Sequence, residues 1–115
     1  MKKFLVLYLT APSVLENWMK TGAEERKAAE SKMQEEWQAW MRANASHIIE
    51  TAGAGATKRV TKEGIADAKN SVMMYSLVHA DSAEEAAKLF EGHPHLGIPE
   101  ASIEIMPANV LPDMQ

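Results

Sequence analysis

The sequence contains no cysteine in its 115 residues. This absence excludes disulfide bonds, a catalytic thiolate and any metal site built on cysteine ligands. A chain without cysteine is compatible with a reducing compartment, and we expect a cytoplasmic protein.

An excess of positive charge is also missing. The chain has 16 acidic and 12 basic residues, which gives a formal net charge of −4 at pH 7. Nucleic-acid binders that rely on a basic patch have the opposite balance. We therefore expect no nucleic-acid partner.

No apolar run is long enough to cross a bilayer. Two lysines and a short apolar run at the start resemble a signal peptide, but the run ends early, and Pro12 and Glu16 interrupt the segment after it. We expect residues 3–9 to form a buried first strand and the protein to have no membrane partner.

The composition fits a single globular domain over residues 1–115. Apolar residues make up 46% of the chain, a share typical of folded proteins. A domain of this length buries roughly 65% of its unfolded surface, which is enough for a hydrophobic core.

Hydrophobic periodicity divides the chain into strands and helices. The expected strands span residues 3–9, 47–51, 57–61, 71–80 and 101–106. The expected helices span residues 12–20, about 24–43, and the segment between Ser82 and Gly92. We expect the strands at 47–51 and 57–61 to form a hairpin across the glycine-rich turn 52–56, and 62–71 to be a surface loop.

Three local signals mark helix ends. Thr21 with Glu24, and Ser82 with Glu85, have the spacing of capping boxes. Gly92 is placed to end the last helix in a left-handed conformation.

This order of elements predicts an α+β fold, a ferredoxin-like βαββαβ sandwich with helices on one face of an antiparallel sheet. The strand at 3–9 is apolar at nearly every position, and the strand at 71–80 is apolar on both faces. Strands of this kind are covered on both sides. A homodimer in which two sheets pack face to face, a dimeric α+β barrel, would supply the second cover.

Several segments, in this order and spacing, resemble the YCII-related family of dimeric α+β barrel proteins. They are Phe4–Tyr8, Thr57–Thr61, Tyr75–Val78 with Ala80–Ser82, Glu85–Ala87, and His93–His95 leading to Ser102–Pro107. The resemblance covers nearly the whole chain and implies the same dimeric fold.

The chain departs from the family at the residues to which chemistry is attributed. Enzyme-like members have an acid before the proline that precedes the last strand, and a histidine on the first long helix; here His93 replaces the acid and the helix at 24–43 has no histidine. Another branch has an Asp-Gly-Pro-Phe segment, of which only Asp67 remains. The family's proposed catalytic pair therefore does not transfer to this chain.

Two histidines close to each other, His93 and His95, flank Pro94 before the last strand. An imidazole titrates near neutral pH, so either ring could act as a general acid or base. Two rings could also bind a metal, but a site needs a third ligand such as Glu91, Glu104 or Asp67. In a third interpretation the ring nitrogens tie the helix end to the strand. We expect no metal and no cofactor.

Two functions are consistent with these patterns. The first is a small-molecule enzyme of isomerase, lyase or dehalogenase type, and the second is a non-catalytic ligand-binding or homo-oligomeric module. The candidate catalytic residues are His93, His95, Asp67 and Tyr75. The candidate ligand-binding residues are Trp18, Trp37, Trp40 and Met74. Whether the protein is an enzyme stays open at this point, because fold does not determine function.

Overall fold

The computed structural model describes residues 1–109, so the last six residues of the expected domain lie outside the described part. Four strands form one antiparallel sheet in the order β2-β5-β1-β6. They are β1 (Lys2–Leu9), β2 (Ile48–Gly53), β5 (Val72–Ala80) and β6 (Ser102–Pro107). This order, with helices between the strands, confirms the predicted ferredoxin-like α+β arrangement.

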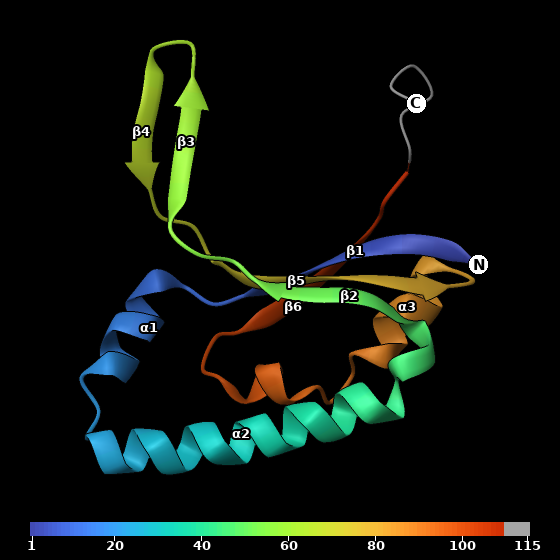
Figure 1. The fold of residues 1–115 in the computed structure, drawn as a ribbon, viewed down its shortest axis with the longest axis horizontal. Coiled ribbons are helices and arrows are strands. Elements are labelled where there is room, and N and C mark those ends of the chain that lie inside the picture. The colour runs from blue at the N-terminus through green and yellow to red at the C-terminus, as the bar shows by residue number, and fades with distance from the viewer. Residues whose placement is uncertain (110–115) are drawn as a thin grey trace.

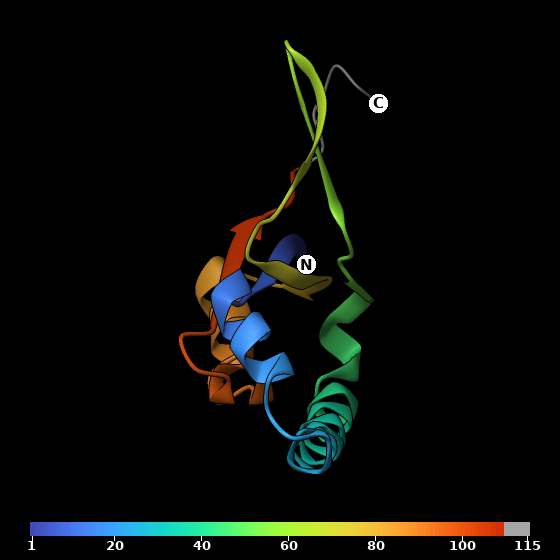
Figure 2. The same cartoon turned by 90° about the vertical axis from the view of Figure 1, so that its left-hand side faces the viewer.

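Helices cover one face of this sheet (Figure 1). They are α1 (Pro12–Met19), α2 (Ala23–Ala43) and α3 (Ala83–Leu89), with two short 3₁₀ turns, η1 (Ala45–His47) and η2 (Pro94–Gly97). In both views η2 lies on the same side of the sheet as α2 (Figures 1 and 2), and it contacts α2 and β6. None of the helices within residues 1–109 is long and apolar enough to span a bilayer.

The core lies between the helices and the two central strands. Side chains of β1 and β5 alternate, and those that face the helices are buried. The buried apolar residues are Phe4, Val6, Tyr8, Val78, Ala80, Ala86 and Phe90. In β5 the buried residues Ser76, Val78 and Ala80 alternate with partly buried ones, as the two-residue period of a strand requires.

The other face of the sheet is uncovered in the protomer. A row of apolar side chains crosses it, because Leu5 pairs with Leu77 on one side and with Met106 on the other. All three are only partly buried. This row has the character expected of an interface.

The predicted hairpin between residues 47–51 and 57–61 is wrong. Instead, β3 (Thr57–Thr61) pairs with β4 (Gly64–Ala68), which lies in the segment expected to be a loop. The turn between them leads into Gly64 at φ 126°, a backbone angle that favours glycine. The two strands form a hairpin that stands apart from the four-stranded sheet (Figure 1).

One predicted capping interaction is confirmed and one is wrong. The Glu85 N–H donates to the Ser82 hydroxyl at 3.1 Å, and Gly92 has φ 71° just after α3. At α2, however, the N-cap is Gly22 and no side chain caps the helix. The helix begins one residue later than Thr21 requires, which leaves Glu24 at the second rather than the third helical position.

Candidate functional site

The turn that carries the two histidines folds inward, against β1 and α2. The side chains of His93 and His95 are each 1% exposed. His93 precedes Pro94, which opens η2, so His93 is the N-cap of a 3₁₀ turn and His95 lies within that turn, instead of both lying on an extended segment. The two predicted catalytic histidines thus belong to the core of the protomer.

His95 joins this turn to the end of β1. Its Nε2 atom donates a hydrogen bond to the Leu9 carbonyl at 3.0 Å. Because a carbonyl can only accept, the proton of the neutral ring lies on Nε2. One of the two imidazoles therefore ties the helix end to a strand.

His93 has one engaged nitrogen and one without a partner. The backbone N–H of His95 donates to Nδ1 of His93 at 3.0 Å, so the neutral ring carries its proton on Nε2. That Nε2–H is buried and has no hydrogen-bond partner among residues 1–109. Burial, and to a smaller extent the neighbouring His95, lowers the pKa of His93 to about 4. The ring is neutral at pH 7.

Aromatic rings enclose His93. Trp37 and Trp40 of α2 meet it edge to face, with ring centroids 4.4 Å and 4.5 Å away. Tyr8 lies 5.4 Å and Phe90 5.8 Å from the same ring. Both indoles are only partly buried. They separate His93 from solvent.

A hydrogen bond holds the Trp40 indole in place, whereas the Trp37 indole is held by packing contacts. Nε1 of Trp40 donates to the Leu89 carbonyl at 3.0 Å, which anchors this indole to the end of α3. The structure gives no hydrogen bond for the Trp37 indole among residues 1–109. Trp37 instead packs on Tyr8, with ring centroids 5.2 Å apart.

A chain of hydroxyl groups starts at Tyr8, one of the aromatic residues around His93. Tyr8 Oη lies 2.8 Å from Ser76 Oγ, which lies 2.7 Å from Thr51 Oγ1. Burial raises the pKa of Tyr8, while the bond with Ser76 opposes this. The phenol is therefore neutral at pH 7, and it links β1 through β5 to β2.

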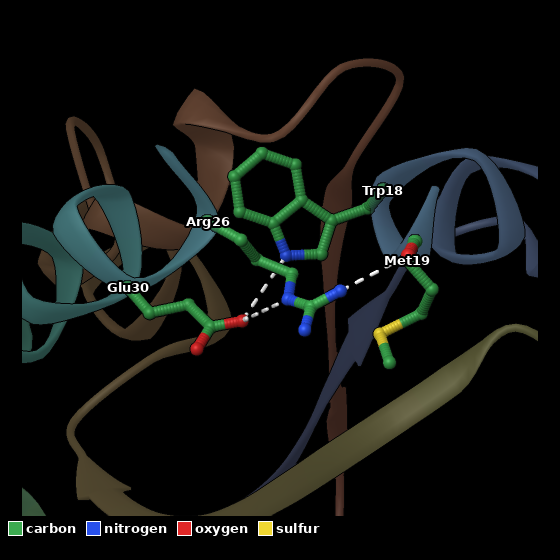
Figure 3. Close-up of polar contacts among 4 residues, drawn as sticks. All are labelled: Trp18, Met19, Arg26 and Glu30. Atoms are coloured by element: carbon green, nitrogen blue, oxygen red, sulfur yellow. Dashed lines mark hydrogen bonds and ion pairs between the residues drawn. The ribbon is translucent and has the colours of Figure 1, made fainter. Parts of the chain in front are cut away.

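The third tryptophan lies apart from the other two. Trp18 is at the end of α1, and its Nε1 donates to Glu30 Oε1 at 3.3 Å (Figure 3). Arg26 pairs with the same Glu30 oxygen at 4.0 Å and donates to the Met19 carbonyl at 3.0 Å (Figure 3). These contacts join α1 to α2, which is the role the geometry assigns to Trp18.

Two further predicted catalytic residues, Asp67 and Tyr75, lie away from His93 and His95. Asp67 is on β4, exposed, and forms an ion pair with Lys58 across the hairpin. Tyr75 is on the uncovered face of the sheet, where its hydroxyl donates to Glu50 Oε2 at 2.7 Å. This bond raises the pKa of Tyr75. Met74, a predicted ligand-binding residue, packs against the core on the helix-covered face.

A cavity of about 270 Å³ lies where β1 ends and the hairpin begins. Thr10, Leu15, Asn70 and Met73 are among the residues that line it. Thr10 is buried, and its hydroxyl has no hydrogen-bond partner in the part of the chain that the structure describes. The preceding residue, Leu9, accepts the hydrogen bond from His95 through its carbonyl. The cavity and the two histidines therefore both lie near the end of β1.

Within residues 1–109, no three histidine or carboxylate side chains are gathered as a metal site. Tyr8 and Thr10 are the site residues that sequence reasoning missed. Both follow from the alternation of the first strand, which places residues 4, 6, 8 and 10 on one face. A polar group at a buried position of that face is the signal that could have found them.

No family model and no curated protein matches the chain. Among solved structures, it is similar to 5-chloro-2-hydroxyhydroquinone dehydrochlorinase (TftG) from Burkholderia phenoliruptrix AC1100, solved in complex with 2,5-dihydroxybenzoquinone. The TM-score is 0.54 over 93% of this chain and 93% of that chain, with 14% sequence identity. The similarity shows that the two chains share a fold.

Proposed function

We propose that the protein is a YCII-related, dimeric α+β barrel protein that binds a cyclic small molecule and acts on it through His93. The observation that carries the proposal is the Nε2–H of His93, a buried donor with no partner between two indoles. Buried polar groups are almost always hydrogen-bonded, so an orphaned one suggests an acceptor supplied from outside the chain.

The protonation state of His93 suggests its role. With a pKa lowered to about 4, the ring is a neutral donor at pH 7 and a weak base. A neutral imidazole N–H can stabilise negative charge that develops on a carbonyl or phenolic oxygen by donating a hydrogen bond to it. In this proposal His95 is a positioning residue, because its backbone N–H fixes the orientation of the His93 ring.

The neighbouring fold and the surrounding rings suggest the substrate class. TftG was solved with a dihydroxybenzoquinone, a planar ring with oxygens on its edge. Trp37 covers His93 and has packing contacts only, so movement of this indole would open a route to a ring of that shape. Trp40 would stay in place as a second aromatic surface for the ligand, because its indole is hydrogen-bonded to the Leu89 carbonyl.

Non-catalytic binding is the alternative function. It is favoured by the hydrogen bonds that already occupy His93 Nδ1 and His95 Nε2, because this is the pattern that a purely structural turn requires. In that case a ligand would bind in the cavity beside Thr10, with the unpartnered hydroxyl as its polar contact.

The dimeric state is supported by the surface area of the protomer. Its accessible surface is 8223 Å², whereas a compact monomer of 12.7 kDa exposes about 6,200 Å². The excess is about 2,000 Å². A stable interface buries about 800 Å² per partner, so an excess of this size is large enough to include one.

Calorimetric titration with 2,5-dihydroxybenzoquinone tests the binding, and chloride release from 5-chloro-2-hydroxyhydroquinone tests the chemistry. We expect His93→Gln to weaken binding at least about tenfold and to abolish turnover. His47→Gln is the matched control, because His47 is a half-buried histidine that bonds to the His79 carbonyl. Circular dichroism verifies that both variants are folded.

Three results decide between the proposals. Equal binding by wild type and His93→Gln would show that His93 does not contact the ligand. Binding without conversion, lost on Thr10→Val but kept in His93→Gln, would establish the non-catalytic alternative. A wild-type protein that neither binds nor converts these ring compounds would rule out this substrate class.

A further inference from the structure

The hairpin formed by β3 and β4, residues 57–68, projects from the sheet as an arm. In both views it extends away from the side that carries α2 and α3, so it rises on the side of the uncovered face (Figures 1 and 2). Its two strands pair with each other and with no strand of the four-stranded sheet. A copy of the protein seated on the uncovered face would therefore lie beside the arm.

The arm carries an apolar pair that has no cover in the protomer. Val60 and Ile65 lie opposite each other in the register, and they are 73% and 75% exposed. Since side chains alternate along a strand, they share one face with the ion pair of Lys58 and Asp67. An isolated two-stranded hairpin is marginally stable in water, so an exposed apolar pair on one suggests a surface that packs against it.

We infer that the arm reaches across a second copy of this chain and that Val60 and Ile65 are buried against that copy. The inference rests on the dimer proposed above and adds a second contact region to it. In a twofold interface each protomer supplies one arm, so the Val60–Ile65 pair of each protomer is buried against the other.

The shape of the protomer favours a second copy over an unrelated partner. The radius of gyration is 16.2 Å, compared with about 13 Å for a compact chain of this length. The extents are 50 × 45 × 19 Å, and the arm lengthens the protomer in the direction in which helices and sheet are stacked (Figure 1). The uncovered sheet face and the arm each carry apolar side chains and lie on the same side of the protomer, an arrangement compatible with a self-complementary interface.

The test measures dimer dissociation by analytical ultracentrifugation for wild type, Val60→Lys with Ile65→Lys, and Met19→Lys. Met19 is the matched control, because it is an apolar side chain on α1 that is 63% exposed. We expect the arm variant to raise the dissociation constant at least about tenfold and the control to change it by less than about twofold.

A second measurement reports on the arm directly. Because the chain has no cysteine, Val60→Cys can be labelled at one site with a polarity-sensitive fluorophore, with labelled Met19→Cys as control. Dilution of the dimer should shift the Val60 probe to the emission of an aqueous environment and leave the Met19 probe unchanged.

The outcomes separate this inference from the proposals on which it depends. A wild-type dimer with an unchanged dissociation constant in the arm variant, or with an unchanged Val60 probe, overturns the inference and leaves the dimer standing. A wild-type monomer at micromolar concentration overturns both. Loss of ligand binding by His93→Gln bears on the proposed chemistry alone.

Discussion

His95 and Leu9 are 86 positions apart in the chain, and the histidine Nε2–H donates to the leucine carbonyl at 3.0 Å. This bond ties η2 to the end of β1, one residue before the cavity-lining Thr10. The same residue also orients the His93 ring, because the backbone N–H of His95 donates a hydrogen bond to His93 Nδ1.

We predict that His95→Leu destabilises the protein by about 2 kcal/mol, because it leaves the part-buried Leu9 carbonyl without its donor. His95→Gln should cost less, since its amide N–H can take the place of Nε2–H. Urea denaturation of the two variants measures the difference. Equal losses would mean that packing, rather than this hydrogen bond, is what His95 contributes.

Stability should depend on pH through His93. The folded-state pKa is about 4, below the usual value of 6.5. Above pH 6.5 neither state binds this proton, whereas between pH 6.5 and pH 4 the unfolded chain binds it and the folded chain does not. The free energy of unfolding should therefore fall by about 3 kcal/mol as the pH is lowered through this window.

Replacement by a residue that does not titrate isolates the His93 contribution. His93→Asn removes it while keeping all carboxylates, so the difference between the two pH profiles should be flat above pH 6.5 and sloped below. Thermal unfolding from pH 4 to pH 8 supplies both profiles. Parallel profiles would show that His93 protonates in the folded state as readily as in the unfolded one.

The indoles of Trp40 and Trp18 should differ in their contribution to stability. Trp40→Phe leaves the part-buried Leu89 carbonyl without a donor and should cost about 1–2 kcal/mol. Trp18→Phe removes an exposed bond to Glu30 and should change stability by less than about 0.5 kcal/mol. Chemical denaturation of both variants gives the comparison, and a larger cost at Trp18 would contradict it.

The two predicted capping residues provide a similar pair. Ser82→Ala should lower the free energy of unfolding by about 1 kcal/mol, because the hydroxyl accepts the Glu85 N–H at the start of α3. Thr21→Ala should stay within about 0.5 kcal/mol of wild type, because α2 begins after Gly22 without a side-chain cap. Similar costs for both would indicate that Thr21 also caps its helix.

Much of the fold could be predicted because the information is local. The period-two pattern of residues 72–80 places Ser76 and Val78 on the buried face, and the Ser82–Glu85 spacing marks the start of α3. Each of these features depends on neighbours within a few positions, where sterics and hydrogen bonding limit the backbone to few choices.

The arm could not be predicted from the same patterns. The sequence favours pairing of residues 57–61 with 47–51, but they pair with 64–68. Neither β3 nor β4 has a buried face within the protomer, so hydrophobic alternation, which sets register elsewhere, carries no information there. Turn geometry at Gly64 decides the pairing instead.

The sequence alone establishes the main helices and strands other than β4, and the presence of two imidazoles before the last strand. Only the tertiary structure decides that these imidazoles are buried, because Trp37 and Trp40 come from a helix far earlier in the chain. The pKa of His93 and its unpartnered nitrogen depend on that long-range packing, since burial and hydrogen-bond partners, rather than residue type, determine the chemistry of a histidine.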